Sequence, residues 1–403
     1  MARKSVLGSV LRLCLLGLVA LLLTAGWLTG CQSRQSAPFH AESTVVPFSV
    51  KPFSAYQTAV NEWLLAHRHP VKFDLATEAA FNTPFECGQG NPRGILLVHG
   101  LGDSPYFFRD ISAPLCERGF WVRTILLPGH GSQPGDMLNA RYDLWQQTVD
   151  FQVEAFAPNV ETLFLGGFST GANLVTVTAS SRRDISGLIL FSPAFLPNFF
   201  VTRLAPWVTD VWPWPNVEPE DNPARYNSIA MQGFAAYQGS VEAVQHVIEK
   251  TQHTLPHFAV LAEGDSVVDV QAVASQLNTQ LYHSDNVLLW MGSAETAPEG
   301  ARVQPFPVLR ERALAASHMS VLFSEHNSLY GANGSVRICD NGQPADIEAQ
   351  CPSTSTNTLW YGPWGQEGEG KVVARLTFNP YFDEMMAQLL TFLENASQAE
   401  RPD

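Results

Sequence analysis

Residues 162–175 read TLFLGGFSTGANLV and contain the clearest indication of the fold class. Its apolar beginning predicts a buried β-strand, and the residues from Ala172 onward predict a helix. Between them, Gly167-Phe168-Ser169-Thr170-Gly171 puts a serine on a tight strand-to-helix turn with small neighbours. A serine held there exposes its Oγ beside a helix N-terminus, where backbone N–H groups face developing negative charge. The context favours Ser169 as a nucleophile over an ordinary turn serine.

Similar short apolar runs recur on both sides of this turn, separated by stretches with helical spacing. Continuous apolar strands that alternate with helices predict an α/β fold, with a mostly parallel sheet covered on both faces. The predicted strands are 94–98, 121–127, 162–165, 187–191, 258–262 and 287–291. The predicted helices are 53–67, 106–118, 141–157, 171–182 and 381–395.

A second motif, His99-Gly100-Leu101-Gly102-Asp103, follows directly after the first of these strands. Its glycines let the backbone bend so that the N–H of Leu101 can face the nucleophile. Together with the N–H of Thr170 it would form an oxyanion hole, which stabilises the charge of a tetrahedral intermediate. We interpret His99 as a residue that fixes this loop by hydrogen bonding, because it precedes the nucleophile in the chain.

Three motifs together resemble a known family: HGLG at 99–102, LPGHG at 127–131 and GFSTG at 167–171. They resemble the α/β-hydrolase superfamily, and within it the branch of monoglyceride lipases, lysophospholipases and serine aminopeptidases. The resemblance covers roughly residues 90–320 and is absent from 327–377. It implies an α/β-hydrolase fold with an inserted cap, and a catalytic triad in the chain order serine, acid, histidine. We interpret His130 as shaping its loop rather than binding a metal.

The resemblance also implies the other two members of the triad. Asp265 follows a predicted strand where the family carries a Gly-Asp turn, and Asp269 stays open as the alternative acid. The implied base is His318, which lies in the small-residue loop Ala-Ser-His-Met-Ser. His326 is the alternative base, while His283 falls in a polar turn before a strand.

These residues predict a serine hydrolase of the carboxylesterase or lipase type. Ser169 would attack an acyl carbonyl, His318 would take its proton, and Asp265 would orient the imidazole. Water then hydrolyses the acyl-enzyme, so we expect no metal and no organic cofactor. The expected small-molecule substrate is an ester of a monoacyl lipid, such as an acylglycerol or a lysophospholipid.

The same scaffold hosts serine aminopeptidases and thioesterases, so the fold alone does not choose among them. An aminopeptidase needs an acidic subsite for the free amine of its substrate, which Glu218, Glu220 and Asp221 could provide. A further alternative is a non-catalytic envelope lipoprotein that uses the fold to bind a partner. An intact Ser169, Asp265 and His318 set argues against this last alternative.

Two long segments interrupt the alternation of strands and helices. Residues 194–254 are too long for an ordinary connection and are predicted to form a cap. We expect the aromatic residues of this cap to form its core, a wall for the acyl chain, or both: Phe195, Phe199, Phe200, Trp207, Trp212 and Trp214. Residues 327–377 form a second, mostly polar insertion within the hydrolase domain, which we place at 53–403.

The first 30 residues have the pattern of a secretory signal. Basic residues precede an uncharged apolar run over 13–28, which is short for a membrane span. The run ends in Leu28-Thr29-Gly30-Cys31, which resembles a bacterial lipobox, so Cys31 is the expected site of lipid attachment. We therefore expect a tether over 31–52 and a membrane contact made by the acyl chains. Because Gln32 replaces the aspartate of an inner-membrane signal, we expect an outer-membrane lipoprotein of the bacterial envelope.

Four of the 6 cysteines remain after Cys14 is assigned to the signal and Cys31 to lipid attachment. An even number in an oxidising compartment indicates two disulfides, for which three connectivities exist. Closeness in sequence favours Cys339–Cys351, which leaves Cys87–Cys116, with buried free thiols as the alternative.

Charge excludes one class of partner. The chain has 24 Lys and Arg against 38 Asp and Glu, a formal charge of −14, and no basic cluster longer than Arg182-Arg183. Nucleic-acid binding requires a basic stripe to contact phosphates, so we expect none.

Overall fold

The computed structural model describes residues 38–42, 44–250 and 255–398. The expected signal peptide and the expected lipidation site Cys31 lie outside these residues. Within the described ranges, no helix is both long and apolar enough to cross a bilayer.

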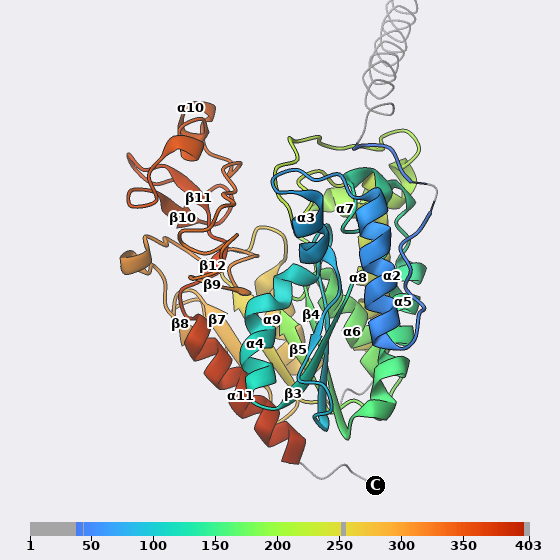
Figure 1. The fold of residues 1–403 in the computed structure, drawn as a ribbon. Coiled ribbons are helices and arrows are strands. Elements are labelled where there is room, and N and C mark those ends of the chain that lie inside the picture. Colours follow the sequence, from blue (N-terminus) through green and yellow to red (C-terminus); the bar gives the residue numbers. More distant parts are fainter. Residues whose placement is uncertain (1–37, 43, 251–254, 399–403) are drawn as a thin grey trace, which may run out of the picture.

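An eight-stranded sheet runs through the centre of the molecule in the order β1-β3-β2-β4-β5-β6-β7-β8 (Figure 1). Strand β1 is antiparallel to β3, and all other neighbouring strands are parallel. The mostly parallel sheet predicted from the apolar runs is confirmed, although the short edge strands β1 and β8 were not predicted. The bounds are β1 Glu86–Cys87, β2 Arg93–Val98, β3 Phe120–Ile125, β4 Thr162–Phe168, β5 Gly187–Phe191, β6 His257–Ala262, β7 Val287–Met291 and β8 Arg302–Gln304.

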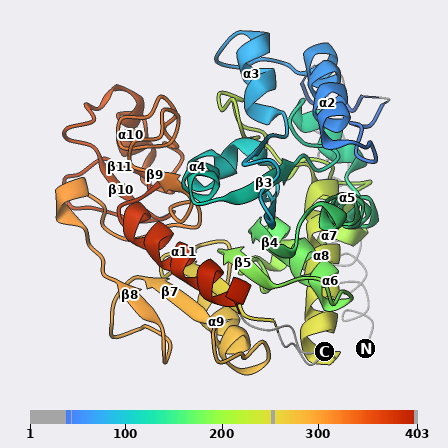
Figure 2. The same ribbon diagram turned by 60° about the horizontal axis from the view of Figure 1, so that its bottom comes forward.

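Helices cover both faces of this sheet, as the alternating pattern predicted. Their bounds are α2 Phe53–His67, α3 Leu75–Asn82, α4 Arg109–Glu117, α5 Tyr142–Phe156, α6 Thr170–Ser180, α7 Phe200–Val208, α8 Met231–Lys250, α9 Val270–Thr279, α10 Ala345–Glu348 and α11 Phe382–Gln398. Figure 2 shows α11 on the opposite side of the sheet from α6 and α8.

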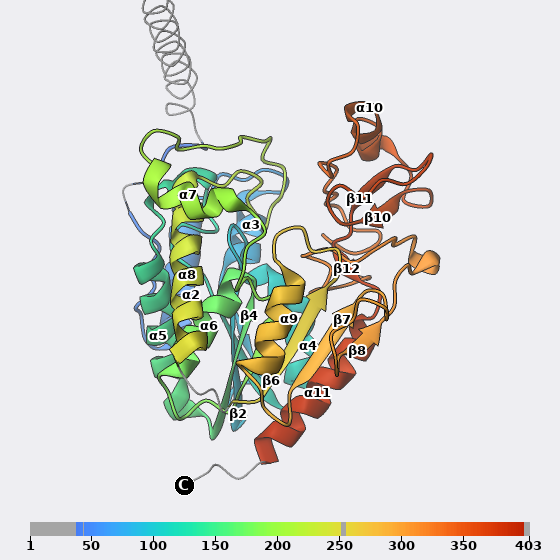
Figure 3. The same ribbon diagram turned by 180° about the vertical axis from the view of Figure 1, so that it is seen from behind.

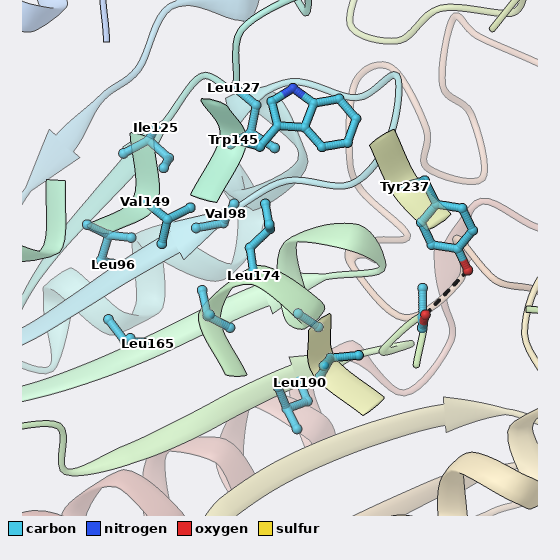
Figure 4. Packing of buried hydrophobic residues seen from close by; sticks show 14 of the residues in the cluster. Leu96, Val98, Ile125, Leu127, Trp145, Val149, Leu165, Leu174, Leu190 and Tyr237 are labelled. Atoms are coloured by element: carbon cyan, nitrogen blue, oxygen red, sulfur yellow. Dashed lines mark hydrogen bonds between the residues drawn. The ribbon is translucent and has the colours of Figure 1, made fainter. Parts of the chain in front are cut away.

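The two faces of the sheet belong to separate hydrophobic clusters, because successive side chains of a strand point in opposite directions. Leu96 and Val98 of β2 pack in a cluster with α2, α5, α6, α8 and α9, part of which Figure 4 shows. Ile95 and Leu97 of the same strand pack in the other cluster, with α4 and α11. A strand that is buried on both faces reads as a continuous apolar run, which explains why the sequence revealed it.

Two excursions lie at the end of the sheet where the parallel strands terminate (Figures 1 and 3). The cap follows β5 and contains α7 and α8, and α8 packs against α6. The disulfide-bearing insertion contains α10 and two small sheets, β10 Trp360–Gly362 with β11 Val373–Arg375 and β12 Phe378–Asn379 with β9 Phe323–Ser324. It has its own small hydrophobic cluster, which includes Leu359 and Leu376.

The four described cysteines form two disulfides with the connectivity that closeness in sequence favoured. Cys87–Cys116 joins β1 to α4, and Cys339–Cys351 closes a loop of the insertion.

The interpretation of the cap aromatics as cap core is wrong for four of the six. Two are buried, namely Phe195 and Trp214, whereas four are exposed: Phe199, Phe200, Trp207 and Trp212. Helix α7 contacts α8, and Thr202 and Ala205 are its buried residues. The aromatic side chains of α7 therefore lie on its outer face, away from the cap core.

The predicted tether over 31–52 also needs correction in its described part. Residues 38–52 do not extend freely from the domain, since Val46 is buried and the carbonyl of Pro38 accepts a hydrogen bond from the Gly135 N–H. The carbonyl of His40 accepts a second one from Gln133. Polar, proline-rich composition suggested a free segment, but its backbone carbonyls and a few apolar side chains find partners on the domain.

Candidate active site

The turn that carries Ser169 has the strained backbone expected of an exposed nucleophile. Ser169 adopts φ +53°, a left-handed conformation that is rare for residues other than glycine. The flanking glycines are required by space: a Cβ on Gly171 would lie 2.0 Å from the carbonyl oxygen of Val98. A Cβ on Gly167 would lie 2.3 Å from the backbone of Gly171. The G-x-S-x-G pattern therefore reflects the close packing of α6 against β2 and β4.

His318 and Asp265 meet next to this turn. His318 Nδ1 lies 2.5 Å from Asp265 Oδ2, and the His318 ring packs against the Phe168 ring with centroids 5.0 Å apart. The other carboxylate oxygen of Asp265 accepts hydrogen bonds from the backbone N–H groups of Val267 and Val268. These contacts fix the carboxylate and leave Nε2 of the imidazole for the serine side of the site.

The alternative triad residues lie elsewhere. Asp269 caps the N-terminus of α9 by accepting a hydrogen bond from the Ala272 N–H. His283 pairs with Asp285 in the turn before β7, and His326 has an exposed side chain near Glu325. The structure therefore pairs His318 with Asp265 beside the Ser169 turn, whereas Asp269, His283 and His326 have other partners.

The loop after β2 approaches Ser169 closely. A Cβ on Gly100 would lie 3.1 Å from Ser169 Cβ, so only a glycine lets the loop come this near. The adjacent Leu101 and the first residue of α6, Thr170, are the two residues predicted to supply oxyanion-hole N–H groups. An N–H in the first turn of a helix has no acceptor within that helix, so that of Thr170 is available to a substrate oxygen.

His99 holds this loop against the loop that follows β3. Its Nδ1 hydrogen bonds to the Gly100 carbonyl at 2.8 Å, and its Nε2 accepts from the Leu127 N–H at 3.0 Å. Burial lowers the pKa of His99 to about 4, so the ring is neutral at physiological pH. His130 packs edge-on against His99 and hydrogen bonds to the Leu127 and Pro128 carbonyls. Both histidines are thus used for loop structure.

Asp103 is a site residue for which no sequence pattern predicted a role. A Cβ on Gly100 would lie 2.6 Å from Asp103 Oδ2, so the Asp103 carboxyl and Ser169 flank the same glycine. Burial raises the pKa of Asp103 to about 7, and the opposing influence of Arg225 and His318 only partly offsets this. Arg225, from the cap, lies 3.7 Å from the Asp103 carboxylate. A buried carboxyl with a shifted pKa beside a nucleophile is typical of a functional site.

The cap segment that carries Arg225 is held by the N-terminal helices. The carbonyl of Pro223 accepts hydrogen bonds from Arg68 at 2.6 Å and from Asn82 at 2.9 Å. Arg68 is itself paired with the buried Glu78. No local sequence pattern marks this arrangement, because Arg68 and Pro223 are 155 residues apart. Among the described residues, no group of three or more His, Cys, Asp or Glu side chains is arranged to hold a metal ion.

Known proteins provide a comparison for this arrangement. The sequence pattern of the family described as serine aminopeptidase, S33 matches residues 90–290, a range that includes Ser169 and Asp265 and ends before His318. The chain is also 30% identical over 111 residues to a thermostable monoacylglycerol lipase of Bacillus sp. (strain H-257). That match covers 28% of this chain and 44% of the lipase, so the chain spans less than half of this relative's length.

Solved structures of lipolytic enzymes are similar over about half of the chain. One of two metagenome-derived lipolytic enzymes has a TM-score of 0.47 and 17% identity, covering 52% of this chain and 87% of its own. The monoacylglycerol lipase of Paleococcus ferrophilus has a TM-score of 0.44 and 20% identity, covering 51% and 87%. A soluble variant of the Saccharomyces cerevisiae monoglyceride lipase, bound to a substrate analogue, has a TM-score of 0.44 and 13% identity, covering 60% and 85%.

Three observations identify the fold: the sheet order, the strained serine turn after β4 and the family match. Parallel strands in this order place the ends of β4 and β6 at one edge of the sheet, which is where Ser169 and Asp265 lie. The chain therefore has an α/β-hydrolase fold.

Proposed function

We propose that this protein is a serine hydrolase that cleaves the carboxylic ester of a monoacyl lipid through an acyl-enzyme. The observation that carries the proposal is the His318–Asp265 contact beside the strained Ser169 turn. Three residues from distant parts of the chain converge there in the order and roles of a Ser-His-Asp triad. Such a pairing is difficult to explain in a binding protein, because the buried carboxylate and the backbone strain both cost stability.

In the first half of the reaction, Ser169 Oγ bonds to the acyl carbon as its proton passes to His318 Nε2. The N–H groups of Leu101 and Thr170 stabilise the negative oxygen of the tetrahedral intermediate. The intermediate collapses by breaking the bond to the leaving alcohol, which takes the proton from His318. In the second half, water attacks the acyl carbon as His318 takes its proton, and the bond to Ser169 Oγ then breaks as His318 returns that proton to Oγ, which releases the fatty acid. Asp265 orients the imidazole and stabilises the imidazolium that forms in each half.

The polar groups beside Ser169 favour an ester of an alcohol that carries further hydroxyl groups. The Asp103 carboxyl can accept a hydrogen bond from such a hydroxyl, and Arg225 can donate one. The similarity to a bacterial monoacylglycerol lipase supports the same class of substrate.

An aminopeptidase or a thioesterase on the same scaffold is the second candidate, and the cap acids bear on it. Glu220 accepts hydrogen bonds from the backbone N–H groups of Asn227 and Ser228, and Asp221 accepts one from the Asn227 side chain. These two carboxylates therefore stabilise their own loop, which argues against a free amine site built on all three cap acids.

Two measurements test the proposal. A fluorophosphonate probe should label the wild-type protein and fail to label Ser169→Ala, which separates an enzyme from a silent binding protein. A panel of matched p-nitrophenyl esters, thioesters and aminoacyl anilides should then show the highest kcat/KM for the esters. Labelling without ester turnover, or faster anilide cleavage, contradicts the ester assignment and retains only the nucleophile.

We also propose that the protein is anchored in the bacterial envelope by lipid on Cys31, in the outer membrane. Phe39 packs edge-on against Trp214, so the described chain begins against the face of the cap that carries Trp214. An anchor eight residues before Phe39 would hold that face within about 30 Å of the bilayer surface. Cys31→Ala should accumulate unprocessed precursor. Normal processing and unchanged membrane fractionation of this variant would overturn the assignment.

A further inference from the structure

A polar cleft of about 510 Å³ lies between the cap and the disulfide-bearing insertion. One wall is cap segment 218–222, and the other is segment 334–340 of the insertion. The charged side chains that line it are Lys72, Glu218, Asp221, Arg337 and Asp340. Ligand sites of this size are usually lined by apolar side chains, so these charges indicate a ligand that is itself charged. The insertion wall lies outside the region that matches the family.

Arg225 connects this cleft to the nucleophile. On one side it lies 3.7 Å from Asp103, the carboxyl that flanks the same glycine as Ser169. On the other side its positive charge opposes the rise in the pKa of Glu218 that burial causes. Arg225 therefore stands between the reacting serine and the wall of the cleft.

Arg375 makes a second connection, from the insertion side. Its guanidinium donates hydrogen bonds to Asn341 Oδ1 at 2.7 Å and to the Asp340 carbonyl at 3.3 Å. Burial and, to a smaller extent, the nearby Arg225 lower the pKa of Arg375 to about 10. The carboxylates of Asp340 and Asp265 act in the opposite direction, so this arginine lies close to both the cleft and the triad acid. Arg225 and Arg375 are neighbouring, partly buried cations that lie behind the lining of the cleft, and their charges favour an anionic group nearby.

Asn222 gives independent support for a ligand in the cleft. It lines the cleft, is only 3% exposed, and its Oδ1 accepts a hydrogen bond from the Tyr330 hydroxyl at 2.6 Å. Its Nδ2 has no hydrogen-bond partner among the described residues. A buried donor left unpaired costs roughly 1–3 kcal/mol. A ligand oxygen that accepts from Nδ2 would recover this cost.

We propose that the cleft binds the phosphate-and-ammonium head group of a lysophospholipid whose acyl ester is cleaved at Ser169, an inference that rests on the ester hydrolase function proposed above. The phosphate oxygens face the arginine side and Asn222. The ammonium group faces Glu218 on the cap wall and Asp340 on the insertion wall. A charge-assisted contact to each end of a zwitterion is stronger than a neutral hydrogen bond.

The order of groups in the lipid matches the order of groups in the protein. A lysophospholipid presents its ester, then a glycerol hydroxyl, then phosphate, then ammonium. From the nucleophile outward, the protein presents Ser169, Asp103, Arg225 and the acidic walls of the cleft. A monoacylglycerol ends at the second of these positions and leaves the cleft to water. A lysophosphatidic acid lacks the ammonium and leaves the wall carboxylates facing a phosphate, which is unfavourable.

The test compares three palmitoyl esters with different head groups in the full-length protein: lysophosphatidylethanolamine, monopalmitoyl glycerol and lysophosphatidic acid. The variants are Asp340→Asn on the insertion wall and Glu218→Gln on the cap wall, each of which removes one charge and keeps the shape. Asp346→Asn is the matched control, because this exposed aspartate lies on α10 of the same insertion and does not line the cleft. Thermal melting checks that all variants are folded.

We expect each cleft variant to lower the kcat/KM ratio of lysophosphatidylethanolamine to monopalmitoyl glycerol about tenfold, which is about 1.4 kcal/mol. The control should keep the wild-type ratio. An unchanged ratio in both cleft variants, or an equal change in the control, overturns the proposed head-group site.

A second readout separates this proposal from the ester assignment. Glycerophosphoethanolamine, which has no ester to cleave, should slow fluorophosphonate labelling of Ser169, and Asp340→Asn should weaken this protection severalfold. Protection without turnover of any lipid ester overturns the proposed substrate and supports the cleft. Turnover of the esters without protection supports the proposed function and overturns the cleft.

Discussion

The cap and the disulfide-bearing insertion occupy the same end of the sheet and are held there by different forces. The cap is anchored by α8, whose Val241, Val244 and Ile248 belong to one of the two main hydrophobic clusters. The insertion has a small cluster of its own and is closed by Cys339–Cys351. The cap presents exposed aromatic side chains, whereas the insertion contributes charged side chains to the cleft.

The proposed substrate has two unlike ends, and this difference offers a separate surface for each of them. The sheet supplies the strained serine turn and the carboxylate that orients the histidine. Apolar cap surface suits the lipid end, and the polar cleft suits the head group. Because the two regions are stabilised separately, a change in one should leave the other largely intact.

The largest expected effect is at Ser169, the point on which both regions converge. Ser169→Ala should lower kcat roughly 10³-fold or more on every ester, whatever its head group. Alanine keeps the backbone conformation and removes only a hydroxyl, so the melting temperature should change little. The exposed Ser275 on α9 gives the matched control, Ser275→Ala. Hydrolysis retained by purified Ser169→Ala would reject the mechanism.

Removing the insertion disulfide should separate the two regions. The chain-entropy model gives about 3 kcal/mol for a loop of this size, so Cys339→Ser with Cys351→Ser should make the insertion sensitive to limited proteolysis. The cap and the triad should survive, as fluorophosphonate labelling would show. Loss of labelling in this variant would mean that the insertion and the catalytic fold unfold together.

The link between the cap and the nucleophile should depend on pH through Asp103. Its folded pKa of about 7 lies above the unfolded value near 3.8, so between these pH values the folded chain binds a proton that the unfolded chain has lost. The unfolding free energy should therefore fall as pH rises through this window, by up to about 1.4 kcal/mol for each pH unit. Asp103→Asn should remove this contribution and be more stable than the wild type at pH 7. Denaturant unfolding at pH 5 and pH 7 measures the difference, and parallel curves would contradict it.

The smallest effect on stability is expected on the outer face of the cap. Trp207 is 84% exposed, so Trp207→Ser should change the unfolding free energy by no more than about 0.5 kcal/mol. Activity on dissolved acetyl and longer esters should fall by the same small factor, while activity on esters embedded in vesicles should fall further. Leu309→Ser, at a residue that is 65% exposed outside the cap, is the control. A loss of activity that grows with acyl-chain length on dissolved esters would instead indicate that Trp207 contacts the acyl chain.

Much of the catalytic region was predictable because its chemistry follows a local pattern. The serine turn requires glycines at 167 and 171, since the helix packs directly against β2, and this requirement is written in neighbouring residues. The strands were visible because burial on both faces makes them continuously apolar. Asp265 and His318 needed the family resemblance, because nothing local distinguishes them from other acids and histidines.

The parallel sheet, the nucleophile turn and the loop beside it could thus be predicted from the sequence, because patterns of residues close in the chain mark them. The contacts that form them are long-range, such as that of Gly171 with Val98. Which cap aromatics are exposed could not be predicted from the sequence, because both faces of α7 contain apolar residues. Packing against α8 buries one face and leaves the other exposed. The tertiary structure also brought Arg225 to Asp103 and the cap acids opposite Asp340. Long-range electrostatic pairs of this kind leave no periodic signal, because they join segments that fold separately and meet only in the finished structure.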